Sequence, residues 1–74
     1  MKVKVKSKFD EYLKERGISQ TFVANKVKAT NAMVNKWCKN DEKGYAISTP
    51  SIGYALRIEK LLDCRIGDLY EEIE

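Results

Sequence analysis

The apolar residues between positions 19 and 38 follow a helical period that is broken once in the middle. Val23, Ala24 and Val27 share one helix face, and Val34 and Trp37 resume the pattern after the break. A serine or threonine precedes each run, and its side-chain oxygen can accept from a free backbone N–H at a helix start. The pattern predicts two short amphipathic helices. Since helix nucleation is costly, helices this short must pack against others.

The same spacing predicts further helices on both sides of this pair. The first runs from about residue 8 to residue 16, with Ser7 as its N-cap and Gly17 just past its end. Another begins at Pro50, with Thr49 as its N-cap, and ends near Asp63. A last short helix is predicted from four apolar positions, Ile66, Leu69, Tyr70 and Ile73.

Apolar residues occupy every second position in two short segments, as in a strand: residues 2–6 and residues 45–47. Lysine alternates with valine near the start, so residues 1–7 form either a strand or a flexible basic arm. As a strand, this segment has 45–47 as its best partner, because pairing would turn both apolar sides to the core. Residues 39–49 are expected to form a polar loop, and residues 71–74 an acidic tail that frays.

The chain has 74 residues, which predicts a single domain over residues 1–74 with a modest core. It has no apolar run near the length of a membrane span and no signal-peptide core, so a cytoplasmic protein without membrane association is expected. The first 28 residues carry eight Lys/Arg against three Asp/Glu, and residues 48–74 carry three against six. The basic part includes the first predicted helix of the central pair and favours a phosphate-bearing partner, although a polarised solvated surface would have the same charges.

The residue types present exclude several kinds of chemistry. The chain has no histidine and only two cysteines, Cys38 and Cys64, which predicts small buried thiols and neither a metal site nor a disulfide. It has no glycine-rich phosphate loop and no paired nucleophile and base. We therefore expect a protein that is not an enzyme and has no cofactor.

Two stretches carry a resemblance to a known family, LKERGISQTFVANKVKATNAMVNKW and TPSIGYALRIEKLLDCRIGDLY. Together they resemble the phage-repressor/Cro helix-turn-helix proteins, also called the XRE family. The resemblance implies a mainly α, five-helix lambda-repressor-like DNA-binding domain, with the helix-turn-helix at residues 19–38. It also implies a sequence-specific regulator of transcription that binds double-stranded DNA, of the repressor type that phages and mobile elements carry.

The chain departs from the family pattern at several places. Lys28 stands where the family usually has a turn glycine, and a lysine with positive φ there would cost about 1 kcal/mol. Glu59 occupies a position that is usually small and apolar, and Asp63 replaces a glycine after the helix. The segment between Trp37 and Pro50 is also longer than usual by about six residues.

In this motif the second helix of the pair enters the major groove by its N-terminal residues. The resemblance therefore implies four base-contacting residues on its polar side, Asn31, Ala32, Asn35 and Lys36. Asparagine can pair bidentately with adenine, lysine can donate to guanine, and alanine can meet a thymine methyl. The alternative for these residues is an ordinary solvated helix face.

The first helix of the pair crosses the DNA backbone. Gln20 matches the family's phosphate-binding glutamine, where a side-chain amide and free backbone N–H groups meet one phosphate. Position in the motif adds four more candidates for the backbone: Lys28, Thr30, Lys39 and Lys43. Ordinary surface lysines are the alternative for the three lysines.

A second function class remains open, a protein-binding module of the same fold that acts on another regulator as an anti-repressor or antitoxin does. An exposed apolar patch would favour it, with four candidate members: Phe22, Met33, Tyr45 and Ile47. Met33 either packs beside Phe22 or faces the groove. Members of the family usually bind paired half-sites, so the resemblance also suggests a homodimer.

Overall fold

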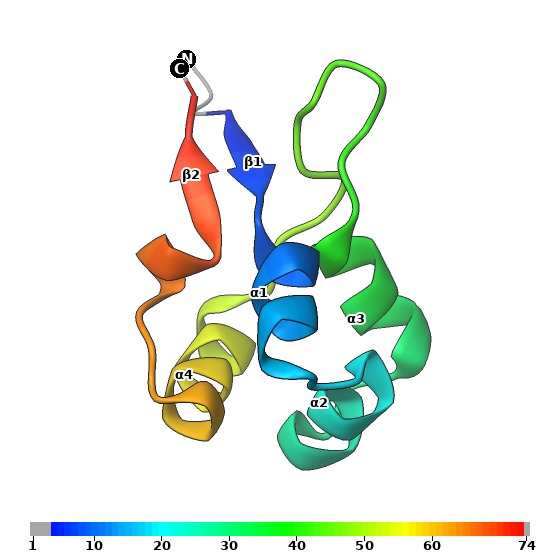
Figure 1. Ribbon diagram of the computed structural model, residues 1–74, viewed down its shortest axis with the longest axis vertical. Helices are drawn as coiled ribbons and strands as arrows, with labels where there is room; N and C mark the ends of the chain where they lie inside the picture. The colour runs from blue at the N-terminus through cyan, green and yellow to red at the C-terminus, as the bar shows by residue number, and fades with distance from the viewer. Residues whose placement is uncertain (1–3, 74) are drawn as a thin grey trace.

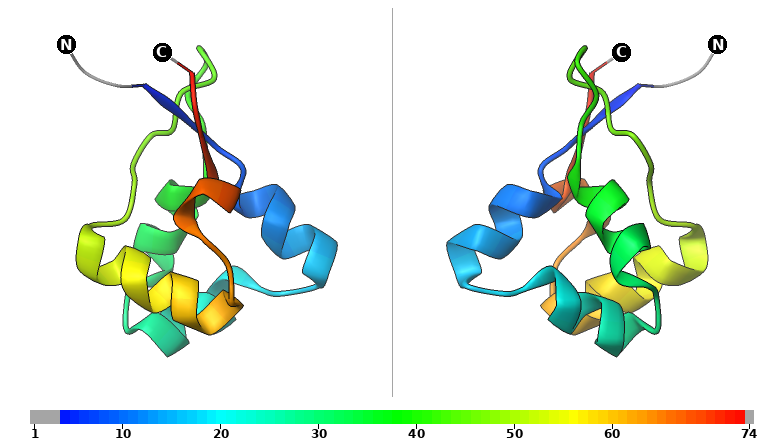
Figure 2. Two further views of the ribbon diagram at one scale, coloured as in Figure 1. Left: turned by 90° about the vertical axis from the view of Figure 1, so that its left-hand side faces the viewer. Right: turned by 90° about the vertical axis from the view of Figure 1, so that its right-hand side faces the viewer.

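The computed structural model describes residues 4–73. Within that range it contains four α-helices, one 3₁₀ helix and a two-stranded sheet (Figure 1). The elements in chain order are β1 (Val5–Ser7), α1 (Phe9–Arg16), α2 (Gln20–Val27), α3 (Asn31–Cys38), α4 (Ile52–Leu62), η1 (Ile66–Asp68) and β2 (Tyr70–Glu72). The helices gather at one end of the molecule, and the sheet lies at the other end with the segment that follows α3 (Figures 1 and 2).

The N-caps of the helices agree with the sequence prediction at α2 and α3 and differ at α1 and α4. Gly17 ends α1 with a left-handed backbone at φ 66°, as predicted for a residue of that type. The prediction of Ser7 as the N-cap is wrong, because Ser7 is the last residue of β1 and Lys8 precedes the helix. The Ser7 hydroxyl still accepts from the Phe9 backbone N–H at 3.3 Å.

Helix α4 begins later than predicted and ends where it was expected to end. Its N-cap is Ser51, which makes no side-chain capping bond, so the prediction of Thr49 as N-cap is wrong. Asp63 takes the left-handed C-cap position at φ 52° and can partly mimic glycine there. The unusual Glu59 accepts a hydrogen bond from the Ile66 N–H at 2.7 Å and so holds the turn after the helix.

The predicted fifth helix is absent from the described residues, and the chain forms η1 and β2 in its place. The Asp68 carboxylate accepts from the Arg65 N–H at 3.0 Å, which closes the 3₁₀ turn. Leu69 is fully buried, and the Tyr70 ring then stands edge-on to Phe9 with centroids 6.4 Å apart. These contacts extend the chain toward β1, so the helical period of residues 66–73 is overridden by tertiary packing.

Residues 5–7 form a strand, but the predicted partner is wrong. β1 pairs antiparallel with β2, with Val5 opposite Glu72, Lys6 opposite Glu71 and Ser7 opposite Tyr70. Residues 71–73 of the predicted acidic tail are therefore held in or beside a strand, and Lys6 faces an opposite charge across it. The segment 45–47 contributes one hydrogen bond to β1, from the Ala46 N–H to the Val5 carbonyl at 2.7 Å. Residues 1–3 of the predicted strand or arm lie outside the described residues.

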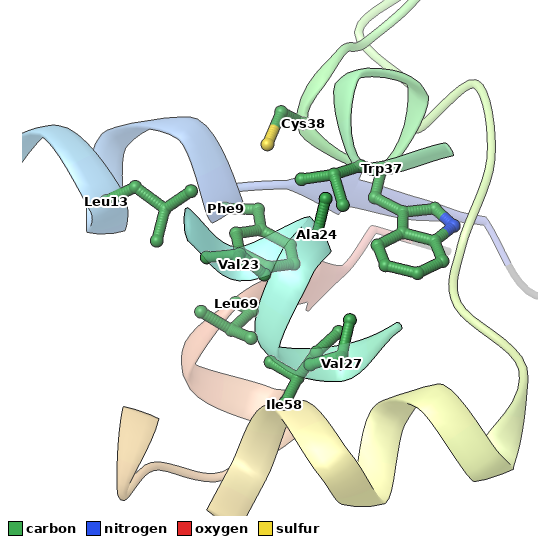
Figure 3. Packing of buried hydrophobic residues seen from close by; sticks show 10 residues of the cluster. Phe9, Leu13, Val23, Ala24, Val27, Trp37, Cys38, Ile58 and Leu69 are labelled. Carbon is green, nitrogen blue, oxygen red and sulfur yellow. The ribbon is translucent and has the colours of Figure 1, made fainter. Parts of the chain in front are cut away.

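The core lies between α1, α2, α3 and α4 and is closed by the turn before β2 (Figure 3). Trp37 is 3% exposed, as its inward spacing from Val34 predicts. The fully buried core side chains with the largest volumes are Phe9, Leu13, Val23, Val27, Val34, Ile58 and Leu69. Cys38 is buried and Cys64 half-buried, both as free thiols, and burial raises the pKa of the Cys38 thiol to about 12.

Candidate nucleic-acid interface

Helices α2 and α3 are joined by a three-residue turn, residues 28–30, as the break in the apolar pattern predicts. The Ser19 hydroxyl accepts from the Phe22 N–H at 3.0 Å, and the Thr30 hydroxyl accepts from the Met33 N–H at 3.1 Å. Lys28 has φ 63°, the left-handed backbone that makes a glycine usual at such a turn. The chain therefore builds the turn in spite of the lysine and presents a cation at its outer side.

Helix α3 has one buried face and one face toward solvent. Val34, Trp37 and Cys38 are buried on the inner side. Among the predicted base-contacting residues, Asn31, Ala32 and Lys36 are exposed and Asn35 is half-buried. These four side chains, together with the exposed Thr30 at the helix start, come from one element, so the structure brings the predicted reading residues together.

Gln20 and Asn35 join α2 to α3 by their side chains. The Asn35 amide nitrogen donates to Gln20 Oε1 at 3.3 Å, which leaves the Asn35 carbonyl oxygen without a protein partner among the described residues. The Gln20 amide nitrogen donates in turn to Asp10 at 3.4 Å. Asp10 also pairs with Lys14 at 3.1 Å. Gln20 is thus oriented by groups on two other helices.

Sequence reasoning missed Asp10. The only local signal at Asp10 is its spacing of four residues from Lys14, which is typical of an ordinary pair on a helix surface. Its contact with Gln20 depends on how α1 packs beside the start of α2. The hydrogen bonds that link Asp10, Gln20 and Asn35 therefore cannot be predicted from the sequence pattern and depend on the fold.

The predicted backbone-contacting lysines lie at three places around α3. Lys28 is in the turn before the helix, Lys39 is its C-cap, and Lys43 is at the tip of the segment that follows. All three are exposed. Among residues 4–73 the ion pairs are Lys14–Asp10 and Arg16–Glu15, so none of these lysines is neutralised by a described carboxylate.

The four apolar residues of the possible protein-binding patch do not form one patch. Phe22 is 44% exposed on α2, and Ile47 is 52% exposed after α3. These two parts of the chain lie at opposite ends of the molecule in both figures of the whole fold (Figures 1 and 2). Met33 is half-buried and packs against the core, which supports the packing alternative for that residue.

Another function would be indicated by a metal site, a membrane-spanning helix or a hollow that could hold a ligand in the part of the chain that the structure describes. No group of three or more Cys, Asp or Glu residues in residues 4–73 is placed to hold a metal ion. No helix of that range has the length and hydrophobicity to cross a membrane. A hollow of about 570 Å³ lies between the start of β1 and residues 45–49, and Lys4, Tyr45 and Thr49 are among its lining residues.

Comparison with known proteins adds a match over most of the chain. A family model described as a Cro/C1-type HTH DNA-binding domain matches residues 8–74. No curated protein and no solved structure matches the chain. The match covers all four α-helices and the turn between α2 and α3.

Proposed function

The chain belongs to the Cro/C1-type helix-turn-helix DNA-binding family, and we propose from this premise that it regulates transcription by binding a specific double-stranded site. The observation that carries the proposal is the solvent face of α3, where Asn31, Ala32 and Lys36 stand exposed beside α2. In this class of motif the second helix enters the major groove while the first crosses the sugar-phosphate backbone.

The proposed base contacts follow from the chemistry of the α3 side chains. Asn31, in the first turn, has a donor and an acceptor in one amide and can pair bidentately with adenine. Asn35 has only part of its amide available, because its nitrogen donates to Gln20. Its carbonyl oxygen can accept from a base amino group. Lys36 can donate to guanine, and the Ala32 methyl can meet a thymine methyl.

The proposed backbone contacts surround that surface. Gln20 keeps a second amide N–H for a phosphate, beside the unpaired N–H groups at the start of α2. The Thr30 hydroxyl accepts from its own helix and still has a proton to donate. Lysines complete the proposed set at Lys28, Lys39 and Lys43.

We further propose a homodimer on paired half-sites and a repressor of phage or mobile-element origin. Dimers of this motif place their two reading helices about one helical turn of DNA apart. Two large apolar residues on α4 support self-association, because Ile52 is 79% exposed and Leu56 is 54% exposed at a spacing of four residues. We propose, together with this function, that the protein acts in the cytoplasm and that it binds DNA without catalysing a reaction.

The competing proposal is a protein-binding module of the same fold. The exposed Phe22 on α2 favours it, because its ring and the half-buried Ile18 line one hollow that an apolar side chain of a partner could fill. Gel-shift and pull-down experiments on one preparation separate the two proposals. DNA binding without a protein partner would support the regulator, and capture of a regulator without any affinity for DNA would support the module.

The decisive experiment selects bound duplexes from a random library and then compares two variants on the selected site. Asn31→Ala should cost about 1–3 kcal/mol on the selected site and little on random DNA, because base contacts specify sequence. Lys39→Ala should weaken both duplexes alike, because phosphate contacts position the protein without specifying. An equal loss on both duplexes for Asn31→Ala would contradict its role at a base edge.

A further inference from the structure

The chain between α3 and α4 contains a hairpin and is not an open loop. The Asp41 N–H donates to the Tyr45 carbonyl at 2.7 Å, and the Ile47 N–H donates to the Lys39 carbonyl at 3.1 Å. Between these bonds Asn40 and Ala46 form a bridge in antiparallel sense. Residues 39–47 are called the hairpin below, and its tip is residues 42–44.

The tip is organised by one carboxylate and one glycine. The Asp41 carboxylate accepts from the N–H groups of Lys43 at 2.9 Å and Tyr45 at 3.0 Å. Those backbone hydrogen bonds, that from Tyr45 foremost, lower the pKa of Asp41. Gly44 takes φ 86°, which permits the tight reversal of the chain. Asp41 is therefore engaged with its own backbone, while Glu42 and Lys43 project from the tip without a described partner.

The hairpin is fastened to β1 at two points. The Asn40 side-chain amide binds the backbone of Ser7 as a second strand would, accepting from its N–H at 2.8 Å and donating to its carbonyl at 3.1 Å. The Ala46 N–H donates to the Val5 carbonyl. Lys4 also stands over the Tyr45 ring, with Nζ 5.2 Å from the centroid. A hairpin held in this way can bind a partner with little loss of conformational freedom.

The hairpin continues from the C-terminal end of α3 along the length of the molecule. It begins at Lys39, the C-cap of α3, and projects away from the helical end of the molecule in both figures of the whole fold (Figures 1 and 2). An extended arm of three residues spans about 10 Å, and the major groove is about 12 Å wide. The eight residues of α3 add about 12 Å between its start and the base of the hairpin. With that start in the groove, the tip therefore extends past the edge of the groove, toward phosphates outside the base pairs that α3 reads.

We propose that the hairpin is a second, rigid DNA-contacting element, an inference that rests on the proposed function. The hairpin binds the sugar-phosphate backbone outside the base pairs that α3 reads. Lys43 makes the phosphate contact at its tip, and Lys39 makes one at its base. Glu42 opposes the approach by its charge, so the two neighbouring tip residues act in opposite directions. The hairpin lengthens the DNA footprint and adds affinity that depends little on sequence.

A length series of duplexes tests the proposal. The probe is the site selected from the random library, extended by flanks of unrelated sequence and then trimmed pair by pair toward its core. Wild-type affinity should fall at the step that removes the phosphates under the hairpin. Lys43→Ala should bind the long duplex about two- to fivefold more weakly, as expected for one exposed ion pair, and should lose less affinity at that step. Its salt slope on the long duplex should fall by about one unit.

Two further variants sharpen the result. Glu42→Gln should tighten binding to the long duplex and leave the core duplex unchanged, because only the long duplex has phosphates near its charge. Lys60→Ala removes an exposed lysine in the last turn of α4, which lies at the helical end of the molecule away from the hairpin (Figure 1), and serves as the matched control. It should respond to trimming as the wild type does.

The outcomes separate the two proposals. Failure of the wild type to bind any duplex would overturn the proposed function and the hairpin contact together. Binding of the wild type with a loss in Lys43→Ala that is zero, or equal on long and core duplexes, would overturn the hairpin contact alone. A hairpin that contacted a protein partner would give that second result.

Discussion

At the scale of single residues, Lys28 shows a conflict between conformation and charge. Its left-handed backbone, φ 63°, is costly for a residue with a Cβ, by about 1 kcal/mol. The same lysine stands at the C-terminus of α2, where the helix dipole favours a cation. It also precedes the helix that we propose enters the groove. The charge thus compensates locally for part of the strain and adds a candidate phosphate contact.

Replacing this lysine should separate the two effects. Lys28→Gly should leave the free energy of unfolding within about 0.5 kcal/mol of the wild type, since relief of the strained φ is offset by the added freedom of the unfolded chain and by the lost attraction to the helix dipole. Its affinity for DNA should fall, with a shallower salt dependence. Urea unfolding followed by circular dichroism measures the first effect, and a salt titration of DNA binding measures the second.

The matched control is Lys26→Gly in the last turn of α2. There the backbone is helical, so glycine should destabilise by about 1 kcal/mol. A Lys28→Gly variant that loses as much stability as this control would show that the turn does not strain the lysine.

At the scale of elements, signals close together in the sequence were sufficient for the four α-helices and insufficient for the last predicted helix and the sheet. Ser19 and Thr30 cap the helices that they were predicted to cap, because a cap bond spans only three residues. The exposure of Asn31 and Lys36 also follows from the helical period. The last predicted helix failed although its four apolar positions keep the helical period, because the burial of Leu69 and the packing of Tyr70 on Phe9 draw the chain into a strand beside β1.

Contacts distant in sequence decided the remaining features. Asn40 was expected in a polar loop, yet its amide binds the backbone of Ser7, 33 residues away. No pattern within the segment 39–49 indicates that partner. Likewise the link from Gln20 to Asp10 depends on the packing of α1 against α2. In both cases the sequence pattern indicates only an ordinary polar surface residue, and the contact that gives the residue its role is formed by the fold.

The hairpin should loosen as a unit when Asn40 is replaced. Asn40→Ala removes two hydrogen bonds to β1 and should lower the free energy of unfolding by about 1–2 kcal/mol. Amide hydrogen exchange should quicken at Tyr45 and Ala46 and change little in α2. Glu42→Ala at the exposed tip is the control, with slow exchange at Ala46 retained. Unchanged protection of Ala46 in Asn40→Ala would mean that the amide does not hold the hairpin.

At the scale of the whole molecule, both strands are bound to the C-terminal end of α3. The Trp37 carbonyl accepts from the Ser7 hydroxyl at 2.6 Å and from the Tyr70 hydroxyl at 2.8 Å. Burial raises the pKa of Tyr70, so its hydroxyl keeps the proton that it donates. The sheet therefore supports the helix proposed to read DNA, and the order of α3 depends on residues near both ends of the chain.

Shortening Tyr70 in two steps tests this support. Tyr70→Phe should cost about 1 kcal/mol, because one hydrogen bond is lost while Trp37 keeps the bond from Ser7. Tyr70→Ala should cost about 3 kcal/mol or more, because the ring that packs on Phe9 is lost as well. Amide exchange at Trp37 and Cys38 should quicken in the second variant. Equal stabilities of the two variants would show that the ring adds nothing beyond its hydroxyl.

The position of Trp37 also makes its intrinsic fluorescence a probe of the end of α3. The chain has one tryptophan, and its indole is shielded from water beside Tyr54, with ring centroids 5.3 Å apart. Its fluorescence should therefore shift to longer wavelength when the end of α3 opens to solvent. Because α3 is buried on that side and exposed on the other, a ligand bound to the exposed side would leave the emission maximum in place. Fluorescence of a single unlabelled sample can thus distinguish binding of a ligand to the exposed side of α3 from separation of α3 from the core.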